Sequence, residues 1–340
     1  MRSRRDPTVR RSDVLRVGFT TLRGDIGPKI FMRRLRDSLQ DQGLVRVSSV
    51  LDPRHDVGLF DSIARAAYGR PYVVRMDGVY YDGALSPAQR EERNGPMRGA
   101  VAHAAGCVYQ SGHAQRMCEA TLGVTAARST VIHNGVPLTL FSPEGPSTRS
   151  RLGVDEDVRI ILASAKWRPV KRLHEYLAVF EVLKRMRSDC CLVLLGDLGV
   201  AGPLPDGVHH AGKATPNDLP QWYRAADVFV NLSYGDPCDN TVVEAIACGV
   251  PCVATSTGGS AEVIRKADAG LVSDCEAPFR YGEHTDVSRL PRLNADAVAA
   301  NVSAVLDDGP QHRARIRREV VDIDAVARSY ATFISDVMAR

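Results

Sequence analysis

Short apolar runs alternate with longer amphipathic stretches from Val14 onward, which is the pattern of strands alternating with helices. In the first half, this pattern predicts strands over LRVGFT, VRVSSV, HDVGLF, YVVRM, GCVYQS and STVIHNG. It predicts helices over IFMRRLRDSLQDQG and over residues 62–68, 87–105 and 113–122. Repeated βα units of this kind predict a parallel sheet that helices cover on both faces.

The pattern restarts after residues 137–150, which are rich in Pro, Ser and Gly. In the second half, it predicts strands over 159–165, CLVLLGD, DVFVNLS and PCVATS, a short VHHAG segment, and helices over 173–187, 217–225, 240–248 and 260–266. Residues 286–340 are basic and predicted to be mostly helical. The fold class is therefore α/β, with two doubly wound, Rossmann-like domains whose parallel sheets face a cleft, where ligands bind in such folds.

These patterns divide the chain into four parts. We expect a disordered basic tail over residues 1–13, an N-terminal domain over 14–138 and a C-terminal domain over 139–320. Residues 321–340 are expected to form a helix that packs back on the N-terminal domain.

Length and composition fit this organisation and limit the partners. The 340 residues are enough for two compact domains. The composition, with 44% hydrophobic and 25% charged residues, is typical of globular proteins. The net charge of +4 fits a locally basic pocket for a phosphate better than a face that coats nucleic acid. Because the basic segments also lack interleaved aromatic residues, we expect no nucleic-acid partner.

The cysteines and the N-terminal residues indicate the cellular compartment in which the protein works. None of the eight cysteines forms a Cys-x-x-Cys pair, so we expect free thiols in a reducing cytosol and no metal site. Residues 1–13 hold several arginines without the apolar region of a signal peptide. No run of about 18 apolar residues occurs, which predicts no transmembrane helix and leaves peripheral membrane contact open. We expect a cytoplasmic location and make no prediction of oligomeric state.

Residues 233–264, SYGDPCDNTVVEAIACGVPCVATSTGGSAEVI, hold the most informative pattern. A strand runs into a loop of Gly, Pro, Asp and Asn, and then into a helix that starts near Asn240 and Thr241. A helix start at the crevice favours an anion such as phosphate. Glu244 lies about one turn into this helix, where a carboxylate can accept two hydroxyl donors from a sugar diol. The alternative is a plain strand-loop-helix connection with a cap.

A second cluster places four cations in one loop after the first strand of the second domain. The segment ASAKWRPVKRL contains Lys166, Arg168, Lys171 and Arg172. At a strand end beside an anion-binding helix, these side chains are suited to neutralising a diphosphate. A solvated basic loop is the alternative.

With both clusters in view, the sequence resembles the retaining family 4 glycosyltransferases of the GT-B fold. Lys166 falls on the Arg and Lys171 on the Lys of the family pattern G-R-x-x-x-x-K-G, while Asp236 and Glu244 fall on the two acidic positions of E-G-F-G-x-x-x-x-E-A. Three further segments match the family, namely ACGVP, GGSAEVI and VIHNGV. The resemblance is strong over about residues 120–270 and weak in the N-terminal domain.

The resemblance implies a donor site for a nucleotide diphosphate sugar, with UDP or GDP as the nucleotide and no metal ion. Lys166 and Lys171 would hold the diphosphate beside the helix start at Asn240 and Thr241. Glu244 would bind the ribose hydroxyls, and Asp236 a hydroxyl of the transferred sugar. Lys at 166 and Asp at 236 depart from the family's Arg and Glu, which puts the sugar contact and the donor identity in question.

Three further segments receive roles by the same resemblance. Gly27 lies in LRGDIGPKIF, where the family has a Gly-rich loop near the donor phosphate. The GVHHAGKA segment nearly spells a phosphate-binding P-loop but ends in Ala, so Gly212 and Lys213 are expected to border the nucleotide base instead. Asp77 follows the fourth strand, where it could orient or deprotonate an acceptor hydroxyl or simply cap a turn.

We therefore expect a retaining hexosyltransferase that moves a sugar from a nucleotide diphosphate to a hydroxyl or other nucleophile of a small molecule or glycan. Asp77, Lys166, Lys171 and Asp236 are its candidate catalytic residues. Cell-surface polysaccharide synthesis and natural-product glycosylation are both consistent with the sequence. The alternatives are an epimerase or phosphorylase of the same architecture, or a nucleotide-sugar-binding protein that has lost catalysis.

Overall fold

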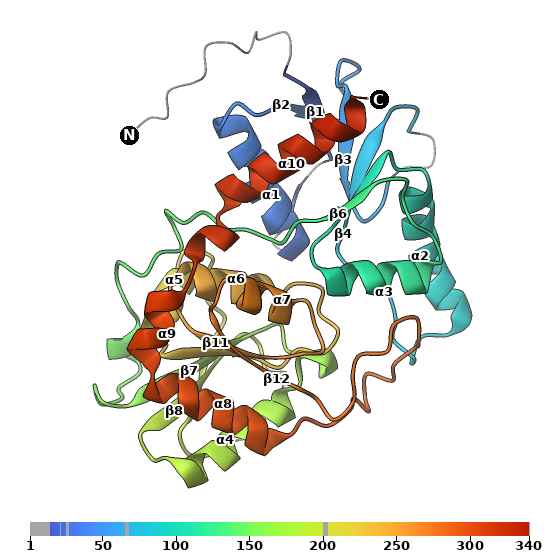
Figure 1. The fold of residues 1–340 in the computed structure, drawn as a ribbon. Coiled ribbons are helices and arrows are strands. Elements are labelled where there is room, and N and C mark those ends of the chain that lie inside the picture. Colours follow the sequence, from blue (N-terminus) through green and yellow to red (C-terminus); the bar gives the residue numbers. More distant parts are fainter. Residues whose placement is uncertain (1–13, 21, 25–26, 65–67, 200–202, 340) are drawn as a thin grey trace.

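Two parallel sheets of six strands each form the centres of two α/β domains, as seen in a computed structural model that describes residues 14–20, 22–24, 27–64, 68–199 and 203–339 (Figure 1). The first sheet has the order β2-β1-β3-β4-β5-β6, with β1 (Arg16–Phe19), β2 (Arg46–Ser49), β3 (Val57–Asp61), β4 (Tyr72–Met76), β5 (Gly106–Tyr109) and β6 (Ser129–Val131). The second has the order β12-β11-β10-β7-β8-β9, with β7 (Arg159–Ser164), β8 (Cys190–Leu195), β9 (Val208–Gly212), β10 (Val228–Asn231), β11 (Cys252–Thr255) and β12 (Gly270–Ser273).

Helices cover both faces of each sheet. The N-terminal sheet carries α1 (Gly27–Asp41), α2 (Pro87–Ala102) and α3 (Gly112–Leu122). The C-terminal sheet carries α4 (Leu173–Met186), α5 (Leu219–Ala225), α6 (Asn240–Ala247), α7 (Ser260–Lys266), α8 (Ala295–Asp307) and α9 (Gly309–Arg315), and the last helix is α10 (Ile323–Met338). The predicted fold class of two Rossmann-like domains is confirmed.

Local chemistry explains where the N-terminal helices begin and end. Ser86 accepts the backbone N–H of Gln89, whose side chain in turn accepts the N–H of Ser86, so a capping box starts α2. The Ser111 hydroxyl accepts the N–H of Ala114 at the start of α3. Gly123 ends α3 with a left-handed backbone, φ 67°, which glycine adopts without steric cost.

The alternation of side chains along each strand builds a core on both faces of the sheet. In β4, Val73 packs toward α1, while Tyr72, Val74 and Met76 pack toward α2 and α3. The same alternation in the C-terminal sheet separates the core under α5, α6 and α7 from the core under α4 and α8. Burial of both faces is why these strands read as nearly continuous apolar runs.

The helix α10 returns from the C-terminal domain to the N-terminal domain and lies beside α1 (Figure 1). Its buried side chains join the N-terminal core and include Ile323, Val326, Tyr330 and Ile334. A second crossing of the chain is parallel to the first, since Val136 and Ile323 exchange backbone hydrogen bonds with the opposite segment. Two segments of the chain, which run side by side at Val136 and Ile323, therefore connect the two domains.

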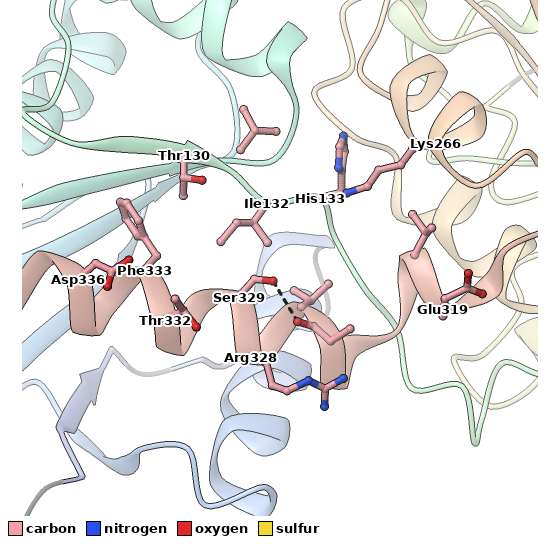
Figure 2. A pocket seen from close by; sticks show the side chains of 14 residues that line it. Thr130, Ile132, His133, Lys266, Glu319, Arg328, Ser329, Thr332, Phe333 and Asp336 are labelled. Atoms are coloured by element: carbon pink, nitrogen blue, oxygen red, sulfur yellow. Dashed lines mark hydrogen bonds between the residues drawn. The ribbon is translucent and has the colours of Figure 1, made fainter.

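A groove of about 650 Å³ lies between α10 and the segment from β6 to His133 (Figure 2). Arg328, Ser329 and Phe333 border it from α10, and Lys266 approaches from the C-terminal domain. The groove shares no lining residue with the cleft described below.

Two details differ from the sequence-based predictions. The helix expected over residues 62–68 is absent at 62–64 and at 68, and residues 65–67 lie outside the described part of the chain. Ser62 has a left-handed backbone, φ 61°, directly after β3, and this turn ends the regular structure. The edge strand β12 was not predicted, because its four residues carry no alternating pattern.

The predicted basic tail at residues 1–13 lies outside the described residues. Within the described residues, no helix is both long and apolar enough to cross a membrane.

One carboxylate of the C-terminal domain caps a helix of the N-terminal domain. The side chain of Glu262 on α7 accepts the backbone N–H groups of Gly112 and His113, both at 2.7 Å. Burial alone would raise the pKa of this carboxyl, but the His133 ring and the two amides lower it to about 2. The contact ties the start of α3 to the opposite domain.

We expect the substitution Glu262→Gln to lower the free energy of unfolding by about 1 to 3 kcal/mol at pH 7, because a charged acceptor is lost from two amides. The folded-state pKa lies below the ordinary 4.5, so this stabilisation is present above pH 4.5 and disappears as the pH falls toward 2. Urea unfolding between pH 3 and 7 measures it. Glu181→Gln, an exposed change on α4, is the control. A difference from wild type that stays constant with pH would contradict the assignment.

Candidate active site

A cleft of about 620 Å³ lies between the two domains. Its N-terminal wall comes from the start of α1 and from the residues that end β3 and follow β4. Its C-terminal wall comes from residues 168–170, after β7, and 234–237, after β10. Both walls are therefore built from the carboxyl ends of parallel strands, the edge where α/β sheets bind ligands.

Arg75 organises the N-terminal wall from a fully buried position. Its Nη1 donates to Asp77 and lies 3.5 Å from Oδ1 of Asp61, and its Nη2 donates to Gln110 at 3.1 Å and to Asn134 at 2.8 Å. The side chain is 1% exposed. A buried guanidinium needs these paired acceptors, so Arg75 fixes the positions of both carboxylates.

Asp77 lies in the cleft, where the sequence placed a candidate base. Burial raises the pKa of its carboxyl to about 6, against the opposing effect of Arg75. One carboxylate oxygen accepts from Arg75 and from Gln110, and the other, Oδ2, has no hydrogen-bond partner among the described residues. A carboxyl that lines a cleft and has a pKa near 6 is suited to accepting a proton near neutral pH.

Lys171 is buried behind the C-terminal wall in the short 3-10 helix Pro169–Lys171. Its ammonium donates to Asp236 at 2.8 Å, to Asp239 at 2.7 Å and to Ser233 at 3.1 Å. Three acceptors therefore use the three donors of this ammonium. Burial opposes its charge, but the two carboxylates outweigh burial and raise its pKa above the ordinary value.

The two aspartates beside Lys171 differ in their environment. Burial and the charge of Asp239 raise the pKa of Asp236, which lines the cleft. Burial also opposes ionisation of Asp239, but Lys171 and hydrogen bonds from Asn231 and Ser233 lower its pKa. Lys171 thus lies between two carboxyls whose pKa values shift in opposite directions, and Asp236 is the one that faces the cavity.

Glu244 is buried on α6 and has both oxygens in contact with protein groups. Arg34 of α1 donates to Oε1 at 3.0 Å, and the hydroxyl of Tyr223 donates to Oε2 at 3.0 Å. Burial raises the pKa of this carboxyl despite Arg34. The carboxylate expected to face ribose hydroxyls thus forms an interdomain ion pair in this structure.

The helix α6 starts at Asn240, where the sequence predicted a helix start. Asp239, rather than Asn240, occupies the cap position, and its side chain bonds Lys171 instead of the helix amides. Asn240 donates to the carbonyl of Gly27 at 3.2 Å and so joins α6 to the start of α1. Thr241 has a buried hydroxyl with no hydrogen-bond partner among the described residues.

The remaining candidates lie outside the cleft wall. Lys166 is exposed in the loop after β7 and makes no hydrogen bond or ion pair with any described residue. Gly212 ends β9 with φ 70°, and a Cβ added there would meet nothing within 4 Å. Lys213 is exposed and pairs with Asp197 at 3.2 Å.

Sequence reasoning missed Asp61, Arg75, Asp239 and Arg34. Asp61 ends β3 just as Asp77 follows β4, so the rule that strand ends meet at one edge could have found it. Asp239 stands in the acidic motif itself. Arg34 carries no local signal, because its partner is 210 residues away. No group of three His, Cys, Asp or Glu side chains suited to a metal ion occurs among the described residues.

Known proteins resemble the C-terminal half most closely in sequence. The family model described as glycosyl transferases group 1 matches residues 158–284, which include Lys166, Lys171, Asp236 and Glu244. Over residues 158–284 the chain is therefore similar to the group 1 glycosyl transferases.

Several curated relatives of the chain share a name. D-inositol 3-phosphate glycosyltransferase of Streptomyces bingchenggensis is 29% identical over 186 residues, which cover 49% of this chain and 40% of the relative. The protein of that name from Frankia alni is 31% identical over 199 residues, covering 50% and 48%. The chain thus aligns with less than half the length of these two relatives.

Solved structures match over the whole chain and show the GT-B fold. Sucrose-phosphate synthase from Thermosynechococcus elongatus has a TM-score of 0.71 at 17% identity, covering 96% of this chain and 99% of that chain. HepE of Anabaena in complex with UDP and glucose has a TM-score of 0.65 at 18% identity, covering 95% and 100%.

Proposed function

We propose that this protein transfers a sugar from a nucleotide diphosphate sugar to a hydroxyl, or another nucleophile, of an acceptor in the interdomain cleft, with retention of anomeric configuration. The observation that carries the proposal is the meeting of Asp77 and Asp236, from opposite domains, in one cleft of a chain that is similar to the group 1 glycosyl transferases. The reaction would take place in the cytoplasm.

In the proposed reaction, a bond forms between the acceptor oxygen and the anomeric carbon as the bond from that carbon to the diphosphate breaks. Negative charge then grows on the diphosphate, where the exposed cations Lys166 and Arg168 and the start of α6 can stabilise it. Asp77 orients or deprotonates the acceptor hydroxyl, and Asp236 contacts the transferred sugar. Positioning of donor and acceptor between the two domains supplies much of the rate enhancement.

For the donor we propose a UDP sugar first and a GDP sugar second. The support is the likeness in fold to HepE, whose structures contain UDP or UDP-glucose. Gly27, Gly212 and Lys213 remain our candidates for the nucleotide side of the site, although Lys213 would have to leave Asp197.

Binding of the nucleotide is tested by thermal shift with UDP, GDP, ADP and TDP. At a concentration of 100 times the dissociation constant, the matching nucleotide stabilises the folded protein by about 2.7 kcal/mol and raises its melting temperature. Incubation with the matching donor sugar and a set of acceptors then tests transfer. If none of the four nucleotides changes the melting temperature, the proposal fails.

The variant Lys166→Ala is expected to weaken nucleotide diphosphate binding by about 10-fold, which corresponds to about 1.4 kcal/mol. Its melting temperature without ligand should equal that of the wild type, because the exposed Lys166 forms no hydrogen bond or ion pair with the described residues. Calorimetric titration measures the affinity. Lys184→Ala, an exposed change on α4, is the matched control. Equal affinities of the two variants for the nucleotide diphosphate would show that Lys166 is not part of the binding site.

A second candidate function is nucleotide-sugar binding without transfer. Two observations favour it. All three donors of the Lys171 ammonium and both oxygens of the Glu244 carboxylate are used in contacts within the protein, which leaves neither group free for a substrate. Donor binding with neither transfer nor hydrolysis would support it over catalysis.

A further inference from the structure

Two carboxyl groups of the N-terminal wall converge on one nitrogen atom. Asp61 of β3 and Arg75 of β4 are register partners, and Asp77 follows Arg75 by two positions. Side chains at register partners, and at positions two apart along a strand, point to the same face of a sheet. Nη1 of Arg75 contacts Oδ1 of Asp61 and Oδ1 of Asp77, so the two carboxyls are close neighbours.

Each carboxyl leaves one buried oxygen without a donor from the described residues. Oδ2 of Asp61 accepts from Lys29 at 3.3 Å, and Oδ1 of Asp77 accepts from Arg75 and from Gln110. The oxygens that remain are Oδ2 of Asp77 and Oδ1 of Asp61, which lies 3.5 Å from Arg75, beyond a good hydrogen bond. Both atoms have almost no accessible surface, and they lie within hydrogen-bond reach of each other. A ligand in the cleft therefore does not supply the missing donor.

A proton between these two oxygens supplies it. Two ionised carboxylates at this separation repel each other, whereas one shared proton turns the repulsion into a charge-assisted hydrogen bond. Backbone contacts keep the groups from moving apart, because the N–H of Asp77 donates to the Ser62 hydroxyl at 3.3 Å and the N–H of Ser62 donates to the carbonyl of Arg75 at 2.7 Å. These bonds hold the ends of β3 and β4 together, with one carboxyl on each.

The other groups around the pair act in opposite directions. Arg75 and Lys29 favour ionised carboxylates, while the Tyr330 hydroxyl of α10 and the Cys118 thiol of α3 are neutral at pH 7, since burial raises the pKa of each. The remaining charged residues that line the cleft are Asp82, Arg93, Arg168 and Asp236. Burial, together with the nearby Asp61, outweighs Arg75 and raises the pKa of the Asp77 carboxyl to about 6.

We propose that Asp61 and Asp77 share one proton, held between Oδ1 of Asp61 and Oδ2 of Asp77, and that Asp61 thereby determines when Asp77 is ionised. Asp61 is then a positioning residue, which acts on the acceptor through Asp77. The shared proton does not depend on the function proposed above, but its effect on sugar transfer rests on that function.

The first test is carbon NMR of the full chain with isotope-labelled aspartate side chains, in which the Asp77 signal is identified by its loss in Asp77→Asn. We expect this signal to titrate near pH 6 rather than near the ordinary 3.8. Asp61→Asn is nearly isosteric, and its amide can donate to Oδ2 of Asp77. It should lower the pKa of Asp77 by about one pH unit or more, because a hydrogen bond to the ionised form replaces a like charge. Asp37→Asn, which changes a surface ion pair on α1, is the control and should leave this pKa unchanged.

The second test is the pH dependence of sugar transfer with the matching donor. The rate should fall as the pH drops below about 6 in the wild type, because Asp77 is then protonated. In Asp61→Asn, this fall should occur about one pH unit lower. A merely structural role of Asp61 would instead lower the rate at every pH and leave the position of the fall unchanged.

Two NMR results would overturn the inference: titration of Asp77 in the wild type at or below 3.8, or the same pKa of Asp77 in Asp61→Asn and wild type. A pKa that falls in Asp61→Asn, in a protein that transfers no sugar, would support the shared proton and reject the proposed function. The same fall in pKa, with transfer whose pH dependence does not move, would support the shared proton and reject the proposed role of Asp77 in transfer.

Discussion

Replacement of Lys171 by methionine is expected to lower the free energy of unfolding by about 3 to 5 kcal/mol, because it leaves two carboxylates without their cation in a buried position. Lys171 is 8% exposed, and Asp236 and Asp239 both accept from its ammonium. Urea unfolding followed by circular dichroism measures the change. The same variant should lose all transfer of sugar if the proposed function is correct.

A second substitution makes this prediction specific. Asp239→Asn in the Lys171→Met background should recover part of the lost stability, since it removes one of the two carboxylates that were left without a cation. Lys184→Met, on the surface of α4, should leave the unfolding midpoint unchanged. Equal stability of Lys171→Met and wild type would show that the buried ion cluster does not hold the loop after β10.

The substitution Gly259→Ala is expected to reduce transfer at least 100-fold, because displacement of catalytic groups by about 1 Å has effects of that size. An added Cβ would overlap the carbonyl oxygen of Pro237 and the hydroxyl of Ser111, with the Cβ of Ser111 at 2.7 Å. Ser111 also donates to Pro237 across the domain interface, so the change would push apart the two walls beside Asp236. Steady-state rates with the matching donor measure the effect.

Gly99→Ala is the matched control, because a Cβ there meets nothing within 4 Å and alanine favours the helix α2. It should be at least as stable as wild type and fully active. Small-angle scattering of Gly259→Ala should show a larger radius of gyration than that of Gly99→Ala. A wild-type rate of transfer in Gly259→Ala would contradict the prediction, because it would show that the loop at Pro237 can shift to accept the added Cβ without displacing the catalytic groups.

The fold could be predicted from the sequence because the central strands, such as β4, β8 and β10, are buried on both faces and the long helices have an apolar stripe, both of which are local patterns. The same logic placed Asp77 and Asp236 at strand ends, and the structure brings these two residues into one cleft. The short strand β12 and the turn after β3 were not predictable in this way, since neither has a periodic pattern.

The partners of the charged residues could not be predicted. Glu244 contacts Arg34 and Tyr223, and which side chains reach it depends on how two domains pack, a property that no local window contains. The partner of Lys171 was equally unpredictable. Its loop contains three other cations, and the sequence does not say that Lys171 is the one that donates to Asp239. Spacing identifies residues of the right type, while tertiary packing decides which of them are free to meet a ligand.

The path of α10 has a consequence for biosynthesis. A ribosome makes the whole C-terminal domain before it makes Tyr330 and Ile334, which fill the N-terminal core beside α1. During translation, the face of the N-terminal sheet under α1 must therefore wait with part of its apolar surface uncovered while the second domain folds. We expect the nascent chain to engage chaperones during this interval, and synthesis in cells depleted of them to yield more aggregate than synthesis of a circular permutant that begins with α10.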